Sequence, residues 1–244
     1  DMLGMEIFKI PSGEITNKPL IEHIAKKGKP ILLSTGMSSM EEVERAVSWI
    51  KAVQKNLVSR SESFPHFFYS LPVLLHCVSS YPANFEDLNL RAIKTMKDVC
   101  KLQVGFSDHS RGIEASVAAV AIGASVIEKH FTLDKGMEGP DHVASLDVKE
   151  LKELIVAIRN IEVALGDGIK RPVASEMETR TLVRKSIVAT RNIKAGEKIG
   201  LNGIGIKRPG TGISPEYRDR VACMVAAHPI AADSVIAWED IKDA

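Results

Sequence analysis

The feature that most limits the fold of this chain is an alternation of short apolar runs with helical patterns between residues 1 and about 165. Such an alternation is typical of an α/β protein in which helices connect the strands of a parallel sheet. Five apolar runs have the length and composition of buried strands, at residues 6–10, 30–34, 73–78, 102–106 and 124–127. Helical periodicity is clear in 40–51 and in 148–165, which ends at Gly166. We therefore expect five parallel strands with crossover helices.

Five βα units fall short of a closed (β/α)₈ barrel, which needs about 250 residues by itself. The spacing is also irregular, because 43 residues separate the starts of the second and third runs whereas the other intervals are 24, 29 and 22. The surplus lies near 58–72, an atypical insertion that holds four of the ten Phe and Tyr residues. Two explanations stay open for this insertion: a surface excursion, or non-native sequence introduced by a faulty gene model.

The pattern changes after Gly168. Residues 169–183 are polar and contain Pro172, which favours a linker. From 184 to 244, short β-prone pieces alternate with turn residues. We therefore predict a partial barrel domain over 1–168, a linker over 169–183 and a small β-rich domain over 184–244.

Two histidines carry the clearest chemical signal. His109 and His130 each follow a predicted strand, and the stretch between them is long enough for one crossover helix. Adjacent parallel strands would then hold both imidazoles at one rim, where they suit a divalent transition metal, with Asp108 and Glu128 able to orient the rings or hold a water. The alternative is two hydrogen-bonded barrel histidines with no ion. Strand alternation should turn Lys129 away from the His130 face, which weakens it as an anion-binding candidate.

Composition indicates an ordinary cytoplasmic enzyme. The 32 Lys and Arg residues are balanced by 31 Asp and Glu, so no basic field favours nucleic acid or an acidic membrane surface. Three cysteines without CxxC spacing argue against a disulfide framework or a structural zinc site. No apolar run approaches the roughly 20 residues that span a bilayer, and we see no targeting signal.

Six motifs together give the chain a specific resemblance. They are FKIPSGE (8–14), LSTGM (33–37), HCVSSYP (76–82), GFSDH (105–109), EKHFT (128–132) and GPDH (139–142). In order and in most spacings they resemble the sialic acid synthase family. The resemblance implies an eight-stranded TIM-type barrel, in which the first strand of this chain corresponds to the fourth, so that the first three βα units are absent. It also implies that 184–244 is an antifreeze-like SAF domain of β-clip type, matching best at 206–212.

The resemblance further implies an activity and its residues. The family condenses phosphoenolpyruvate with N-acetylmannosamine and water to N-acetylneuraminate and phosphate. His109 and His130 would bind Mn²⁺ or Mg²⁺, and Glu128 and Asp141 would contact the sugar or share in proton transfer. The implied substrate-binding residues are Lys9, Ser12, Ser34, Ser79, Tyr81, Ser107 and Arg208. Among these, Ser79 departs from some relatives, which have Asn there. Arg208 would reach the sugar's N-acetyl group from a neighbouring subunit of a domain-swapped homodimer.

Other functions stay open on the sequence alone. A legionaminic or pseudaminic acid synthase, acting on a diacetamido hexose, would share nearly all of these residues. An ice-binding module is the alternative from a different class, but ice surfaces demand a flat, mostly uncharged patch, and Lys207 and Arg208 occupy the most distinctive loop of the C-terminal domain. We also expect the chain as written to be inactive, because part of the phosphate-binding set would belong to the absent strands.

Overall fold

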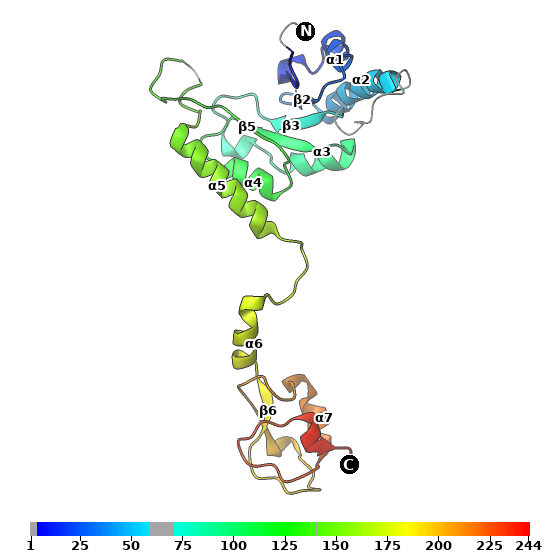
Figure 1. Ribbon diagram of the computed structural model, residues 1–244, viewed down its shortest axis with the longest axis vertical. Helices are drawn as coiled ribbons and strands as arrows, with labels where there is room; N and C mark the ends of the chain where they lie inside the picture. The colour runs from blue at the N-terminus through cyan, green and yellow to red at the C-terminus, as the bar shows by residue number, and fades with distance from the viewer. Residues whose placement is uncertain (1–3, 59–70, 140) are drawn as a thin grey trace. The chain divides into compact units, whose positions relative to one another are not determined.

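The computed structural model describes residues 4–58, 71–139 and 141–244, so most of the predicted insertion at 58–72 lies outside the described residues. The chain separates into two compact units, Asp1–Gly168 and Ile169–Ala244 (Figure 1). Within the described ranges, none of the helices combines the length and the hydropathy that crossing a bilayer requires.

The first unit is built on a five-stranded parallel sheet. Its strands are β1 (Phe8–Ile10), β2 (Ile31–Ser34), β3 (Val73–Cys77), β4 (Val104–Asp108) and β5 (Ile127–Lys129), and they pair in chain order. All five predicted strands are confirmed. β4 and β5 each extend two residues beyond the predicted end, because Ser107 and Asp108 pair with Glu128 and Lys129 although none of these side chains is apolar.

Helices follow the strands as expected of βα units. They are α1 (Lys18–Ala25), α2 (Met40–Val58), α3 (Ala92–Cys100), α4 (Glu114–Ala121) and α5 (Val148–Leu165). Buried side chains of α1 to α4 share one hydrophobic core with the strands, in which Ile10, Leu33 and Leu74 are fully buried. The limits of α5 agree with the sequence prediction, since Asp147 and Glu150 form a capping box and Gly166 ends the helix with a φ of 58°.

The sheet is curved rather than flat. Four inter-strand spacings of about 4.8 Å would place β1 and β5 about 19 Å apart in a flat sheet. Yet Lys9 Nζ on β1 lies 3.0 Å from Glu128 Oε1 on β5. Side chains of the first and fifth strands can meet only if the sheet curls around its inner face. The unit is therefore a half-barrel, and the prediction of a partial TIM barrel is confirmed.

The second unit is small and rich in β-structure. It contains α6 (Met177–Val183) and α7 (Arg218–Cys223), with the antiparallel pairs β6 (Ser186–Ala189) with β7 (Ile204–Lys207) and β8 (Val225–Ala226) with β9 (Ile241–Lys242). Isolated bridges such as Val188 with Val235 link the pieces around a core that includes Ile187 and Ile236. Within 169–183, where the sequence predicts an irregular linker, α6 forms a fully exposed helix too short to show a clear apolar period.

Candidate active site

The carboxyl ends of the five strands surround one cavity of about 370 Å³. Each strand contributes a polar or sulfur-bearing side chain to it: Lys9 from β1, Ser34 from β2, Cys77 from β3, Ser107 from β4 and Glu128 from β5. The cavity also collects side chains that follow these strands, namely Ser12, Ser79, Tyr81, His109 and His130. Nine of the eleven residues predicted from the sequence therefore line a single cavity.

Glu128 is the electrostatic centre of this cavity. Its Oε1 lies 3.0 Å from Lys9 Nζ and accepts a hydrogen bond of 2.6 Å from Ser107 Oγ. The side chains of Lys9 and Glu128 are 35% and 37% exposed, so both reach solvent. One carboxylate thus holds together a lysine and a hydroxyl that the sequence assigned to anion binding.

The two histidines face the same space. His109 Nδ1 donates to the Val78 carbonyl at 2.7 Å, so Nε2 carries the ring lone pair, and it lies 3.4 Å from Ser107 Oγ, which also lines the cavity. Burial lowers the pKa of His109, and neighbouring His130 adds to this effect, while the Val78 carbonyl opposes it. His109 is therefore held as a neutral imidazole, which is the form that ligates metal ions.

Aromatic contacts arrange the rings. The His109 and His130 centroids lie 5.5 Å apart in an edge-to-face arrangement, and the Tyr81 ring lies 4.1 Å from His109 and 5.6 Å from His130. Burial, followed by the charges of Cys77, Asp141 and Glu128, raises the pKa of Tyr81. Tyr81 is thus a neutral phenol that packs against both imidazoles.

The donor set fits part of a divalent-metal site. Two imidazoles at one cavity, one with its orientation fixed by a backbone carbonyl, are typical ligands. Among the described residues no group of three His, Cys, Asp or Glu side chains is placed to hold a metal ion. His109 and His130 therefore fit two positions, and further ligands would come from water, substrate or another part of the barrel.

The cavity lining includes one group that the sequence reasoning missed, the thiol of Cys77. Cys77 Sγ lies 3.2 Å from Ser12 Oγ, and Ser12 Oγ accepts from the Gly36 amide at 2.9 Å. A Cβ on Gly36 would lie 2.4 Å from Ser79 Oγ and 2.9 Å from Ser12 Oγ, so any larger residue there would displace these hydroxyls. Register could have identified Cys77, because it pairs directly with Ser107 and so faces the same side of the sheet.

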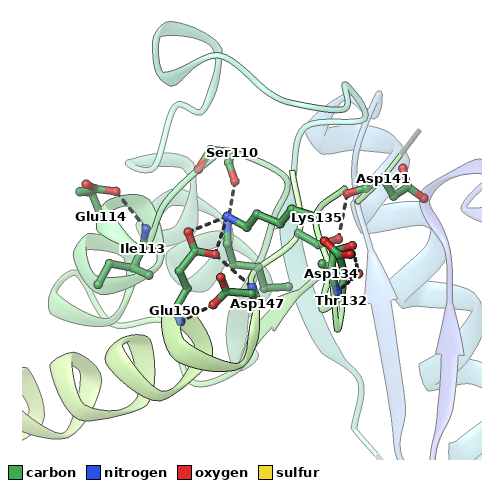
Figure 2. A network of polar contacts seen from close by, with 11 residues as sticks. Ser110, Ile113, Glu114, Thr132, Asp134, Lys135, Asp141, Asp147 and Glu150 are labelled. Carbon is green, nitrogen blue, oxygen red and sulfur yellow. Dashed lines mark hydrogen bonds and ion pairs between the residues drawn. The ribbon is translucent and has the colours of Figure 1, made fainter. Parts of the chain in front are cut away.

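Asp141 reaches the site from the loop after β5. Its Oδ2 lies 3.8 Å from His130 Nδ1, although Asp141 is outside the residues that line the cavity. The same loop is tied to α5, as Figure 2 shows, where Lys135 extends to Glu150 beside Asp147. The Lys135 Nζ to Glu150 Oε1 distance is 2.5 Å.

Two further candidates lie elsewhere. Lys129 points away from the cavity, as strand alternation predicted, and its side chain is 3% exposed beside Asp108. Arg208 is an exposed residue of the second unit, at the end of β7. The loop that follows Arg208 is anchored by Ser186, whose Oγ donates to the Pro209 carbonyl and accepts from the Gly212 amide. The role of Arg208 at a sugar stays a prediction.

Sequence models of two known families match the chain. A sequence model of the NeuB family matches residues 1–170, and one of the SAF domain matches 184–242. The chain is 48% identical to N,N'-diacetyllegionaminic acid synthase of Campylobacter jejuni over 96% of its own length and 66% of that protein. It is 38% identical to mouse N-acetylneuraminate-9-phosphate synthase over 84% of its length and 53% of that protein.

A solved structure is also similar. It is an N-acetylneuraminic acid synthetase from Leptospira borgpetersenii in complex with citrate, with a TM-score of 0.63 and 42% identity, covering 73% of this chain and 57% of that one. The chain spans about two thirds of the length of the Campylobacter relative and about half of the mouse relative.

Proposed function

Because this chain belongs to the NeuB family, we propose that it supplies most of the active site of a synthase that condenses phosphoenolpyruvate with an N-acylated hexose. The observation that carries the proposal is the cavity at the strand ends, which gathers nine predicted residues from five βα units. Strand-end loops are where TIM-barrel enzymes place their chemistry.

The side chains suit the substrates. Lys9 and the hydroxyls of Ser12, Ser34 and Ser107 would bind the phosphate and carboxylate oxygens of phosphoenolpyruvate through charge-assisted hydrogen bonds. An anion that binds Lys9 and Ser107 would replace their contacts with Glu128. The Glu128 carboxylate could then accept a proton from the sugar or from an attacking water. Asp141 beside His130 would share in that transfer.

The reaction balances without a covalent enzyme intermediate. The enol carbon of phosphoenolpyruvate attacks the aldehyde carbon of the open-chain sugar, and the aldehyde oxygen takes up a proton to become a hydroxyl. Water adds to the resulting oxocarbenium carbon and gives up one proton. The C–O bond to phosphate then breaks, and phosphate leaves with the remaining proton of that hydroxyl as the keto group forms. His109 and His130 would hold Mn²⁺ or Mg²⁺, which supplies Lewis-acid polarisation of the aldehyde oxygen when bound. Preorganised donors around the developing charge supply the rest of the stabilisation.

Sequence identity favours a diacetamido hexose over N-acetylmannosamine as the substrate. Identity to the diacetyllegionaminic acid synthase of Campylobacter is 48%, against 38% to the mouse N-acetylneuraminate-9-phosphate synthase. The 42% identity to the Leptospira synthetase keeps N-acetylmannosamine as the second candidate.

The direct test uses a completed barrel, in which the segment of the Campylobacter relative that precedes its aligned region is joined to residue 1 of this chain. Phosphoenolpyruvate and Mn²⁺ are supplied with N-acetylmannosamine or a diacetamido hexose, and phosphate release is measured. We expect a kcat/KM about tenfold higher for the diacetamido hexose, because a site built for a second acetamido group leaves polar partners unpaired without it. Equal kcat/KM values, or a higher value for N-acetylmannosamine, would contradict a diacetamido hexose as the substrate and leave N-acetylmannosamine in its place.

Two controls complete the test. The 244-residue chain should turn over far more slowly than the completed barrel, since catalysis needs the full phosphate-binding set. His109→Ala or His130→Ala in the completed barrel should lower Mn²⁺-dependent kcat by about 10²-fold or more. Activity of the unmutated completed barrel that survives a chelator would contradict the metal assignment.

A further inference from the structure

A buried ion pair lies directly before the two cavity histidines. Asp108 and Lys129 immediately precede His109 and His130, and they are partners in the register of β4 with β5. Lys129 Nζ lies 2.9 Å from Asp108 Oδ2, and the two side chains are 3% and 0% exposed. Neither charge belongs to the cavity, so the mechanism above leaves the pair unexplained.

The pair makes further hydrogen bonds, several of them to α4 and to the start of the loop after β4. Asp108 Oδ1 accepts from the Ser110 amide at 2.8 Å and from its hydroxyl at 2.6 Å. Asp108 Oδ2 accepts from Ser116 Oγ on α4 at 2.6 Å, and Lys129 Nζ donates to the Ser110 carbonyl at 2.7 Å. These contacts tie the ends of β4 and β5 to each other and to α4.

The Asp108–Lys129 ion pair is the last contact between β4 and β5 before the two histidines. The paired residues of β4 and β5 end at Asp108 and Lys129. Beyond that point the backbones diverge, since the His109 carbonyl accepts from the Ala83 amide and the His130 carbonyl accepts from the Leu146 amide. Two separate loops therefore hold the histidine backbones, and the ion pair joins the two residues from which these loops start.

Stability alone is a weak reason for such a pair. Removing two charges from water is costly, and well-packed apolar residues can often replace a buried ion pair without loss. What an apolar pair cannot reproduce is a directional set of hydrogen bonds that fixes both strand ends. We propose that Asp108 and Lys129 are positioning residues that set the spacing of the His109 and His130 imidazoles for cation binding. The proposal rests on the proposed function only in that these imidazoles take the cation.

The test compares four forms of the 244-residue chain: the unmutated chain, Asp108→Asn, Lys129→Met, and the double variant Asp108→Asn/Lys129→Met. Ni²⁺ alone is titrated by calorimetry, because imidazoles bind it more tightly than Mn²⁺. The component lost in His109→Ala identifies binding at this site. Arg191→Met/Glu197→Gln removes an ion pair of the second unit and serves as the matched control.

Each single variant should lower both the unfolding temperature and Ni²⁺ affinity, because it strands an unpaired buried charge. The double variant should regain the unfolding temperature but bind Ni²⁺ about tenfold more weakly than the unmutated chain, the usual size of an outer-sphere effect. A double variant that regains both quantities would show that the pair only stabilises, and would overturn the proposal.

A second measurement needs no metal. Selective labelling of the histidines allows the ring-proton cross-relaxation between His109 and His130 to be measured in the unmutated chain and in the double variant. We expect the signal to weaken in the double variant at matched stability, and an unchanged signal would overturn the proposal. Absence of any His109-dependent Ni²⁺ uptake in the unmutated chain would refute the cation assignment, and the ring signal would then decide this proposal by itself.

Discussion

The two units of the chain enclose their cores in different ways. In the second unit, two short antiparallel pairs and isolated bridges wrap around Ile187, Ile193 and Ile236, all of which are 0% or 1% exposed. In the first unit, among the described residues, β1 and β5 each pair on one side only. Apolar side chains next to these two strands remain in solvent, with Ile7 52% and Leu133 78% exposed.

The two units differ in whether their strand ends converge on one cavity. In the first unit, the curved sheet points its five strand ends into one shared space, where each strand places a polar or sulfur-bearing side chain. The closed second unit offers no such convergence of strand ends, and its distinctive Arg208 lies on an exposed loop. The strand-end cavity therefore belongs to the first unit, and the contribution proposed for the second unit is the exposed Arg208.

The largest difference between the two units should appear when they are expressed separately. Expressed alone, residues 169–244 should unfold in one sharp thermal transition, because their core is complete. Residues 1–168 should show a broad transition and bind a hydrophobic dye, since edge strands and apolar side chains stay exposed. Circular dichroism follows the thermal transition of each unit, and dye fluorescence reports its exposed apolar surface. A sharp transition of 1–168 without dye binding would show that the half-barrel is self-sufficient.

Complementation between two inactive variants would test whether Arg208 acts in the active site of its own chain or in that of a dimer partner. If Arg208 acts across a dimer, mixing Arg208→Ala and His130→Ala forms of the completed barrel should restore about a quarter of the wild-type sites. Half of the randomly formed dimers are mixed, and each mixed dimer has one intact site of two. Turnover that stays at the level of the separate variants after subunit exchange would place both residues in the same chain.

A smaller effect should be confined to the second unit. Ser186 is fully buried and makes two hydrogen bonds to the loop after Arg208. Ser186→Ala should lower the unfolding free energy of residues 169–244 by about 1–3 kcal/mol, because two backbone groups lose their partner. Partly buried Ser214, which makes no capping hydrogen bond, provides the matched Ser214→Ala control. Equal losses in chemical denaturation would contradict the anchoring role.

The smallest effect should be a pH dependence of the first unit. Burial lowers the pKa of His76, although its hydrogen bond to the Leu88 carbonyl opposes the shift. The unfolded chain then binds more protons than the folded one below the ordinary value of about 6.5, so this stability is present above that pH and is lost as the pH falls.

The free energy of unfolding should change by no more than about 1.4 kcal/mol per pH unit, which is the limit for a difference of one bound proton. Denaturation of the unmutated chain and of His76→Gln between pH 7.5 and about 5.5 measures it. The slopes should differ in that range, and parallel curves would assign the dependence to other groups.

Much of this architecture could be predicted from local pattern. Apolar runs located all five strands, and alternation correctly turned Lys129 away from the cavity. The ends of β4 and β5 were missed because polar residues continue the ladder after the apolar pattern stops. The short helix α6 was missed because seven residues give too little period to detect.

The cavity itself was predicted unevenly. Motif residues such as Ser12 and His109 were found, but Cys77 and Gly36 were not, since their contribution depends on register and on close approach of the backbone. The contact of Lys9 with Glu128 joins residues 119 positions apart and depends on the curvature of the whole sheet. No local pattern contains that information.

That contact also means that the cavity carries its own counter-ion. If Lys9 binds the anionic substrate as proposed, an incoming phosphate would exchange with the Glu128 carboxylate, which already lies 3.0 Å from Lys9 Nζ, rather than fill a bare positive site. Small anions from the buffer would also have to compete with the Glu128 carboxylate for Lys9, which would weaken their binding. Under the proposed function, that exchange would also release the carboxylate, so substrate binding itself would make the proton acceptor available.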